Sequence, residues 1–289
     1  MKYYEFSSNI GWSFSRYNTF DRCKRQYYYS YYGKRQDPKV AELAKLESYA
    51  IVKGSVVHDV IAQILHHVKI NHDYPLDRLS NHLNIMTERY LADVTFAESY
   101  YNKDKNDELE VRLRQEIEVP INAFLGSDRF LTLKAQTAAE KATWIIEPGG
   151  YGETRVNELK MYAKADFIFQ KDDRYIILDW KTGKLETKKY MKQLLGYTTY
   201  VCDHFGVSPD VVDAYICHIG DNYSEHSQQF SEFDLSEMAA QVEEQISHME
   251  QYCIYPAENV PKDKSAFPIE QNHLCPYCNF RELCGLVKD

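Results

Sequence analysis

The sequence predicts an α/β fold in which helices flank a mixed central sheet. Strand patterns lie in the second half of the chain, at 142–146, 158–170, 175–180, 211–219 and 224–233. Helical patterns stand before, between and after these strands, which is typical of a mixed α/β core. The chain has 289 residues, of which 44% are hydrophobic. One large domain over 1–289, with a sizeable core, is therefore expected.

Two basic stretches stand out against the formal net charge of −9. The first, at 16–35, has Asp21 as its only acid and contains Arg16, Arg22, Lys24, Arg25, Lys34 and Arg35. The second has Glu186 as its only acid and contains Lys181, Lys184, Lys188, Lys189 and Lys192. Such runs are usually solvated faces, but both flank the chemistry described below. They are therefore candidate phosphate-binding surfaces, although the net charge argues against nonspecific binding of nucleic acid.

The N-terminal segment has no apolar core of the kind found in secretory signals. No stretch approaches the roughly 18 uninterrupted apolar residues that a membrane span needs. A cytoplasmic protein that does not enter a membrane is expected. In that compartment seven cysteines are better explained as ligands or buried thiols than as disulfides.

The first half of the chain is predicted to be mainly helical. Ser13 or Ser15 caps a short helix that runs to about Asp21, and the aromatic run at 27–32 is expected to be a half-buried strand or helix edge. Gly54 opens an amphipathic helix. The charged, periodic sequence from 75 to 125 predicts two or three helices, which form an insertion over 70–135.

His58 lies in the helix opened by Gly54, beside its apolar stripe. A lone histidine in such a place is more often a packing residue than a ligand.

After the strands at 158–170 and 175–180, a helix is predicted from about 188 to 205. Asp234 or Ser236 can cap a final helix that runs to about Tyr252.

A hairpin carries the densest group of chemically active side chains. Its strands, 158–170 and 175–180, are joined by the polar turn 171–174. If that turn has two central residues, the register places Asp166 opposite Asp179. Directly opposed residues have Cβ atoms about 4.5–5.5 Å apart. A shift of one residue in the turn would remove this opposition.

Two carboxylates so close together repel each other unless positive charge lies between them. Mg²⁺ or Mn²⁺ would supply it, since both prefer hard oxygen ligands. Lys181 shares a face with Asp179 and is suited to orient or deprotonate a water, or to stabilise charge on a phosphate. The simpler alternative is an exposed hairpin with solvated charges. The apolar residues around Asp179 argue against that, because unpaired charges at a buried strand would be costly.

The helix after the hairpin places Gln193 and Tyr197 on one face, with Lys189 one turn earlier. That face could hold a phosphate backbone beside the hairpin. Taken by itself, the pattern is weak.

A cluster of cysteines lies near the C-terminus. Cys275, Cys278 and Cys284 are spaced C-x₂-C-x₅-C, and three clustered thiolates usually bind metal with a fourth ligand. Cys23, in the basic N-terminal stretch, is the best candidate for that ligand. The spacing leaves an iron–sulfur cluster, a zinc site and unrelated thiols open.

Together these motifs resemble the PD-(D/E)XK nuclease superfamily. More narrowly, they resemble its RecB-type branch with an iron–sulfur cluster, which includes the AddB nuclease domain, the CRISPR-associated RecB-like exonuclease and exonuclease V. The matching segments are Ser13–Cys23, Gly54–His58, Ala165–Asp166, Asp179–Lys181, Gln193–Tyr197 and the three C-terminal cysteines. Ala165 replaces the proline of the superfamily's name, and Ala163 stands where many relatives have glycine. Neither departure removes a functional group.

The resemblance implies a restriction-endonuclease-like core and a set of site residues. Mg²⁺ or Mn²⁺ would be held by His58, Asp166, Asp179 and the Trp180 carbonyl. Lys181, Gln193 and Tyr197 would complete the catalytic machinery, and Glu140, expected on the strand before the hairpin, would assist.

The resemblance also implies a structural [4Fe–4S] cluster on Cys23, Cys275, Cys278 and Cys284. The cluster would join 13–35 and 256–289 into one lobe. The residues then expected to contact DNA are Arg16, Arg22, Lys24, Arg25 and Lys189.

The expected function is that of a metal-dependent deoxyribonuclease, an exonuclease acting on single-stranded DNA or DNA ends. It would serve repair, recombination or defence, with a helicase or another recombination or CRISPR adaptation protein as partner. The alternative is a non-hydrolysing subunit that binds DNA ends. Intact Asp166, Asp179 and Lys181 argue against it, because a scaffold does not need them.

Overall fold

The computed structural model of the chain describes residues 4, 7–71, 73–148, 152–183 and 187–286, with the backbone alone for 187–189. This part of the chain divides into two compact units. Unit 1 comprises Glu47–Gly152 and Ala163–Leu235, and unit 2 comprises Lys2–Leu46, Glu153–Tyr162 and Ser236–Asp289. The strand β1 (Leu46–Glu47) lies at the first junction between them along the chain.

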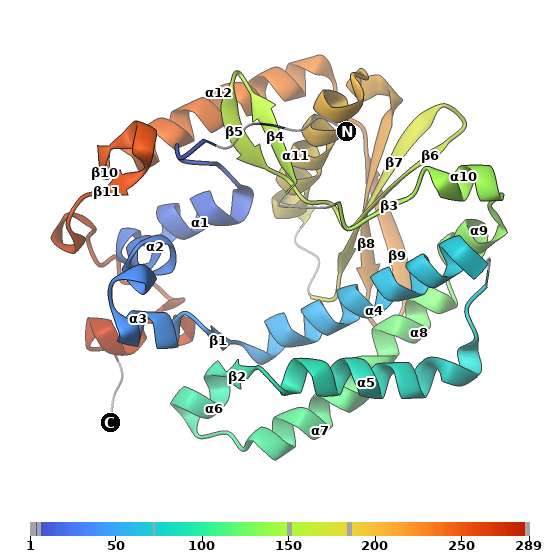
Figure 1. Cartoon of the computed structure of the whole chain (residues 1–289), viewed down its shortest axis with the longest axis horizontal. Helices are drawn as coiled ribbons and strands as arrows, with labels where there is room; N and C mark the ends of the chain where they lie inside the picture. The colour runs from blue at the N-terminus through green and yellow to red at the C-terminus, as the bar shows by residue number, and fades with distance from the viewer. Residues whose placement is uncertain (1–3, 5–6, 72, 149–151, 184–186, 287–289) are drawn as a thin grey trace. The chain divides into compact units, whose positions relative to one another are not determined.

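Unit 1 contains most of the described α-helices and the main sheet; the elements are labelled in Figure 1. Its helices are α4 (Tyr49–Asn71), η2 (Leu76–Arg78), α5 (Leu79–Leu91), α6 (Ala97–Asn102), α7 (Asn106–Glu116), α8 (Glu118–Leu125), α9 (Asp128–Ala135), α10 (Ala138–Ala142), α11 (Thr187–Phe205) and η3 (Pro209–Val211). Its strands are β2 (Thr95–Phe96), β3 (Ile145–Ile146), β6 (Phe167–Lys171), β7 (Arg174–Lys181), β8 (Val212–Ile219) and β9 (Tyr223–Gln228).

Five of these strands form a sheet in the order β3-β6-β7-β8-β9. Only β7 and β8 are parallel, and the other neighbours are antiparallel. The long helix α11 lies between β7 and β8 in the chain and provides the crossover that a parallel pair requires. The sheet is therefore mixed and flanked by helices, as the sequence predicted.

The two faces of the sheet pack against different helices because successive residues of a strand point to opposite sides. Trp180 faces α8, where its ring lies 5.2 Å from that of Phe124. Its neighbour Asp179 faces α11 and meets Tyr197. The larger hydrophobic core of unit 1 lies on the Trp180 face and includes the buried stripe of α4.

Unit 2 is assembled from three separate segments of the chain. Its helices are α1 (Phe14–Arg22), α2 (Lys24–Tyr31), η1 (Gly33–Arg35), α3 (Pro38–Leu43), η4 (Pro256–Glu258), η5 (Lys264–Ala266), η6 (Cys275–Tyr277), η7 (Arg281–Cys284) and most of α12 (Glu232–Glu250). Its strands are β4 (Glu153–Val156), β5 (Leu159–Tyr162), β10 (Cys253–Tyr255) and β11 (Val260–Pro261). Aromatic rings make its core, with Phe20 5.3 Å from Tyr252 and Tyr252 5.0 Å from Phe267.

Several element boundaries differ from the prediction. The aromatic run at 27–32 lies mostly within α2, and α4 begins at Tyr49, whose N–H donates to the carboxylate of Glu98. The predicted strand at 142–146 is the end of α10 followed by the short β3. The predicted strand at 158–170 is wrong, because it consists of β5 and β6 with residues 163–166 between them.

No helix among the described residues is long and apolar enough to cross a membrane.

Candidate active site

The β6–β7 hairpin has the predicted turn and register. Asp172 and Asp173 adopt φ angles of 49° and 58°, which are the left-handed values that a two-residue type I′ turn requires. Lys171 pairs with Arg174, and the ladder continues outward to Phe167 and Leu178.

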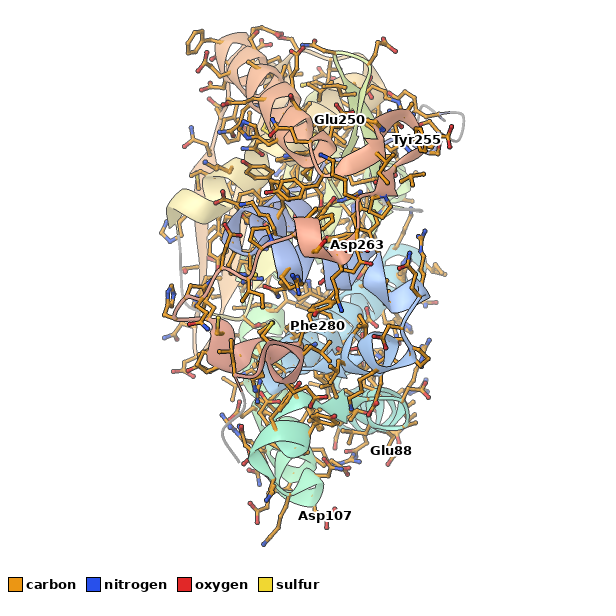
Figure 2. The ribbon with its side chains drawn as sticks, turned by 90° about the vertical axis from the view of Figure 1, so that its left-hand side faces the viewer. Glu88, Asp107, Glu250, Tyr255, Asp263 and Phe280 are labelled. Atoms are coloured by element: carbon orange, nitrogen blue, oxygen red, sulfur yellow. The ribbon has the colours of Figure 1, made fainter. Side chains whose placement is uncertain are left out.

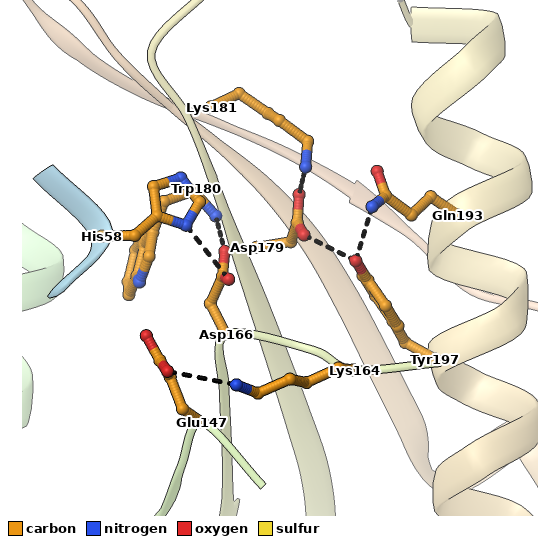
Figure 3. Close-up of polar contacts among 9 residues, drawn as sticks. All are labelled: His58, Glu147, Lys164, Asp166, Asp179, Trp180, Lys181, Gln193 and Tyr197. Atoms are coloured by element: carbon orange, nitrogen blue, oxygen red, sulfur yellow. Dashed lines mark hydrogen bonds and ion pairs between the residues drawn. The ribbon is translucent and has the colours of Figure 1, made fainter. Parts of the chain in front are cut away.

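Asp166 lies just outside that ladder, on a bend before β6. The expected strand pairing of Asp166 with Asp179 is therefore not formed. Instead, Asp166 Oδ2 accepts a hydrogen bond of 2.7 Å from the backbone N–H of Trp180 (Figure 3). The side chain thus reaches across to the end of β7, and the two aspartates still share one site.

His58 reaches this site from α4. Its Nδ1 atom lies 3.2 Å from Oδ1 of Asp166 (Figure 3). The apolar stripe of α4 is buried in the core of unit 1, and this packing fixes the helix that presents the imidazole. His58 thus contacts Asp166 directly, while its role in a site stays a prediction.

Asp179 is the most buried charged group of the site, with a relative exposure of 1%. Its Oδ1 atom accepts a hydrogen bond of 2.9 Å from the Tyr197 hydroxyl, which accepts one of 2.6 Å from Gln193 Nε2. Its Oδ2 atom forms an ion pair with Lys181 Nζ (Figure 3). The structure therefore connects Gln193, Tyr197, Asp179 and Lys181 in one chain of contacts.

The two carboxylates differ in their affinity for a proton. Burial and the nearby charge of Asp166 raise the pKa of Asp179 to about 6. Burial also opposes ionisation of Asp166, but His58, Lys181 and the Trp180 N–H outweigh it and lower the pKa of Asp166. Asp166 therefore keeps its negative charge more readily than Asp179 does.

The basic groups respond to the same carboxylates. Burial lowers the pKa of His58, but the charge of Asp166 outweighs burial and raises it overall. Burial likewise opposes the charge of Lys181, while Asp179 and Asp166 raise the pKa of its amine. Lys181 thus places an ammonium group beside two buried carboxylates.

The donor set of the site fits a divalent cation. Asp166 and Asp179 supply hard oxygens and His58 supplies a ring nitrogen. Apart from its ion pair with Lys181, the buried Oδ2 atom of Asp179 has no hydrogen-bond partner among the described residues. No three His, Cys, Asp or Glu side chains of the described chain are grouped around a common point as a metal requires. The metal ligands, including the Trp180 carbonyl, therefore stay a prediction.

The basic residues predicted to contact DNA are engaged to different degrees. Arg16 donates to the Tyr27 hydroxyl and to the Gly11 carbonyl, and its guanidinium lies 4.7 Å from the ring centre of Tyr31. Because these contacts occupy its donors, Arg16 is the poorest of the candidates. Arg25 donates to the carbonyl of Phe267.

Other members of the basic stretches are paired, exposed or outside the described residues. The Nζ atom of Lys24 lies 3.6 Å from Oε1 of Glu270, whereas the side chain of Arg22 is exposed. The side chains of Lys188 and Lys189, and all of Lys184, lie outside the described residues. DNA contacts stay a prediction for this group.

All four cysteines of the predicted cluster belong to unit 2. Cys23 separates α1 from α2, and the other three lie in the turns around η6 and η7. Burial and the proximity of Cys284, Cys23 and Cys275 raise the pKa of Cys278 to about 11. The backbone N–H of Asn272 lies 3.3 Å from Cys275 Sγ, to which it donates. No three cysteines of this set are grouped among the described residues as a metal site requires, so the iron–sulfur cluster stays a prediction.

The acid expected to assist the site is not Glu140. Glu140 forms a capping box with Thr137 at the start of α10, and its carboxylate accepts from the Thr137 N–H at 2.7 Å. The T-x-x-E spacing of Thr137 and Glu140 is visible in the sequence and predicts this cap.

Glu147 is the acid that lies beside the site instead (Figure 3). Its N–H donates to the Asp166 carbonyl at 2.8 Å, and its carboxylate lies 3.2 Å from Lys164 Nζ. It follows β3 directly and has a left-handed φ of 44°. An acid at the end of an apolar strand is a weak signal, so sequence reasoning missed it.

Comparison with known proteins bears on the family of the chain. No curated protein matches the chain. A solved structure described as "Crystal structure of SSO0001" is 17% identical over 75% of this chain and 99% of the other, with a TM-score of 0.29, a likeness too distant to bear on fold or function. The profile of the PD-(D/E)XK nuclease superfamily matches residues 11–285, which contain every residue of the site. The chain belongs to the PD-(D/E)XK nuclease superfamily.

Proposed function

We propose that this protein is a metal-dependent DNA nuclease whose active site lies in unit 1. One observation carries the proposal. Helix α4 brings His58, the bend before β6 brings Asp166, and the end of β7 brings Asp179 and Lys181 to one place, where Tyr197 of α11 joins them. Members of the superfamily to which the chain belongs are generally nucleases.

Each site residue has a role in this proposal. Asp166, Asp179, His58 and the Trp180 carbonyl would hold Mg²⁺ or Mn²⁺. A bound ion of this kind lowers the pKa of a water ligand and stabilises negative charge on a phosphate.

The remaining side chains position and neutralise charge. Lys181 places its ammonium where charge develops on the phosphate during hydrolysis. Tyr197 fixes the orientation of the Asp179 carboxylate by donating to Oδ1, and Gln193 fixes Tyr197. A carboxylate held in this way does not have to reorient for each turnover.

The proposed substrate is DNA that is single-stranded or presents an end, which the enzyme would degrade as an exonuclease. Basic side chains would follow the phosphates and aromatic side chains would stack on bases. Unit 2 would carry a [4Fe–4S] cluster on Cys23, Cys275, Cys278 and Cys284. The C-x₂-C-x₅-C spacing, the presence of all four cysteines in unit 2 and the N–H group that donates to Cys275 support that assignment.

Digestion of end-labelled and circular DNA by anaerobically purified protein tests the proposal. With Mg²⁺ or Mn²⁺, the wild type is expected to degrade DNA. The Asp166→Ala and Lys181→Ala variants are expected to degrade DNA at least about 100-fold more slowly than the wild type. The exposed residues Asp221 and Lys45 provide matched controls, since neither takes part in the hydrogen bonds and ion pairs of the site. A circular substrate that stays intact while linear DNA is degraded identifies an exonuclease.

Binding without cleavage would overturn the nuclease proposal. If the full chain bound DNA ends equally well as wild type and as Asp166→Ala, and neither cleaved with any metal supplied, the protein would be a non-hydrolysing end-binding subunit.

A further inference from the structure

Tyr277 is the most exposed large hydrophobic side chain among the described residues, with 79% of its surface accessible. Most tyrosines near the N-terminus behave differently. Tyr27, Tyr28, Tyr29 and Tyr32 are each at most 7% exposed. An apolar ring left in water forgoes the stabilisation that burial gives the others, so its position calls for another explanation.

The turn that carries Tyr277 is anchored on both sides. Its N–H donates to the Leu274 carbonyl at 3.0 Å, and the next N–H, of Cys278, donates to the Cys275 carbonyl at 3.1 Å. Two residues after Cys278, Phe280 is buried, with its ring 5.2 Å from that of Tyr29; Phe280 is labelled in Figure 2. The ring of Tyr277 is therefore presented on a fixed backbone, which lowers the entropic cost of a contact.

The charge of this segment suits a polyanion. Residues 271–281 contain no Asp or Glu, although the whole chain has a net charge of −9. The flanking acids are both paired, Glu270 with Lys24 and Glu282 with Lys39. The exposed Arg22 is adjacent, since its carbonyl accepts from the side chain of Asn272.

From these observations we propose that Tyr277 is a stacking platform for a base of single-stranded nucleic acid, with DNA as the substrate class. An exposed, anchored aromatic ring on an acid-free segment beside an exposed arginine suits the binding of single strands without sequence preference. The inference rests on the proposed function, because it assigns a substrate contact to unit 2. It does not depend on how the two units are arranged.

A tryptophan reporter tests the contact directly. Trp12, Trp144 and Trp180 are at most 4% exposed, so Tyr277→Trp adds an exposed indole to buried ones. Tyr255, labelled in Figure 2 at the end of β10, is 60% exposed and lies in the same unit. Tyr255→Trp is therefore the matched control.

The measurement is fluorescence during titration of the full chain with an oligothymidine of about 15 nucleotides, in EDTA and at fixed salt. The indole at position 277 is expected to be quenched at saturation, and the one at position 255 is not. Equal quenching at both positions, or none at position 277, overturns the proposal. In the second case the exposed ring serves a protein partner or no ligand.

Affinity measurements separate the ring from the hydroxyl. Anisotropy of the labelled oligonucleotide is expected to show about 5- to 100-fold weaker binding for Tyr277→Ala, with Tyr277→Phe within about 2-fold of the wild type. If Tyr277→Phe loses as much as Tyr277→Ala, the hydroxyl makes the contact and stacking is wrong. The tryptophan and phenylalanine variants keep the test valid if the alanine variant does not fold.

The nuclease proposal and the stacking proposal for Tyr277 can be contradicted independently of each other. Binding that depends on Tyr277 without any cleavage would contradict the nuclease proposal alone. Cleavage with unaltered binding by Tyr277→Ala would contradict the stacking proposal alone.

Discussion

At the scale of single residues, Asp179 shows how one buried carboxylate is held in place by neutral and charged donors. Tyr197 donates to one oxygen and Lys181 forms an ion pair with the other. Because the carboxylate is 1% exposed, water cannot replace a lost donor. The orientation of Asp179 therefore depends on α11, although that helix supplies none of the proposed metal ligands.

Tyr197→Phe tests this dependence. Removing the hydroxyl deletes one hydrogen bond to a charged group, a change typically worth about 1.5–3 kcal/mol. We expect kcat to fall about 10- to 100-fold, the Mn²⁺ concentration for half-maximal activity to rise, and KM for DNA to stay within about 2-fold of the wild type.

Steady-state kinetics at several metal concentrations check the prediction. Tyr200→Phe is the matched control, because Tyr200 lies on the same helix and its ring packs against His204, with 4.0 Å between the ring centroids. A Tyr197→Phe variant with unchanged metal dependence would show that the tyrosine does not position Asp179.

At the scale of elements, an ion-pair network joins α4 to α7. Glu116 on α7 accepts from Lys53 on α4 at 2.8 Å and from Arg112 of its own helix at 2.6 Å. Burial alone raises the pKa of Glu116, but hydrogen bonds from Lys53 and Arg112 outweigh it and lower the pKa to about 2. The network therefore helps to fix the helix that presents His58.

The pH dependence of stability follows from the sign of this shift. A lowered pKa means that Glu116 stabilises the fold at pH values above about 4.5, its ordinary value. The contribution is lost as the pH falls through about 2. We expect Glu116→Gln to unfold more easily than the wild type at pH 6. Because a third of the side chain is exposed, the difference should be below about 1 kcal/mol.

Urea unfolding at pH 6 and at pH 3 measures this difference. The difference in the free energy of unfolding between the wild type and Glu116→Gln should be smaller at pH 3 than at pH 6. Glu110→Gln, on the same helix but outside the ion pairs of Glu116, is the control and should show the same free energy of unfolding as the wild type. A difference that is equal at both pH values would mean that the amide disturbs packing instead of removing an ion pair.

The elements also show which parts of the fold the sequence could predict. The β6–β7 register was predictable because Asp172 and Asp173 tolerate left-handed backbone and the strands alternate. The break at 163–166 was not, since β5 pairs with β4 instead of extending β6. Strand patterning does not show which partner a strand will find.

Some relations among the site residues were likewise predictable from the sequence, and others were visible only in the fold. Lys181 and Asp179 lie two apart on one strand, so local periodicity placed them together. Glu147 could be found only from the fold, because its link to Asp166 is a backbone hydrogen bond between distant segments. Arg16 is engaged by Tyr27 and Tyr31 through tertiary packing that a charge count does not reveal.

At the scale of the whole molecule, the thiols and the carboxylates belong to different units. The four cysteines lie in unit 2 and the carboxylates in unit 1. If the thiols bind a cluster, its binding energy stabilises unit 2 first.

The Cys278→Ser variant tests whether a cluster on these thiols stabilises unit 2 before unit 1. We expect loss of the broad visible absorption of an iron–sulfur protein and faster hydrogen exchange in α1, α2 and η6, because the ligated turns lose their anchor. Strands β7 and β8 should keep their protection. Cys202→Ser, at a thiol of α11 in unit 1, is the control. A colourless wild type with bound zinc would contradict the iron–sulfur assignment, and uniform deprotection of both units would contradict the separation.

The contacts of the β4–β5 hairpin link the segment before Asp166 to residues that are synthesised much later. Tyr162 ends β5 in unit 2, and its N–H donates to the carbonyl of Trp12, whose indole donates to Gln245 on α12. Asp166 follows Tyr162 by four residues. The ribosome makes Gln245 only after all of unit 1, so a growing chain lacks the last support of the strand that leads to this aspartate. The segment that leads to Asp166 therefore gains its full set of contacts only after Gln245 has been translated.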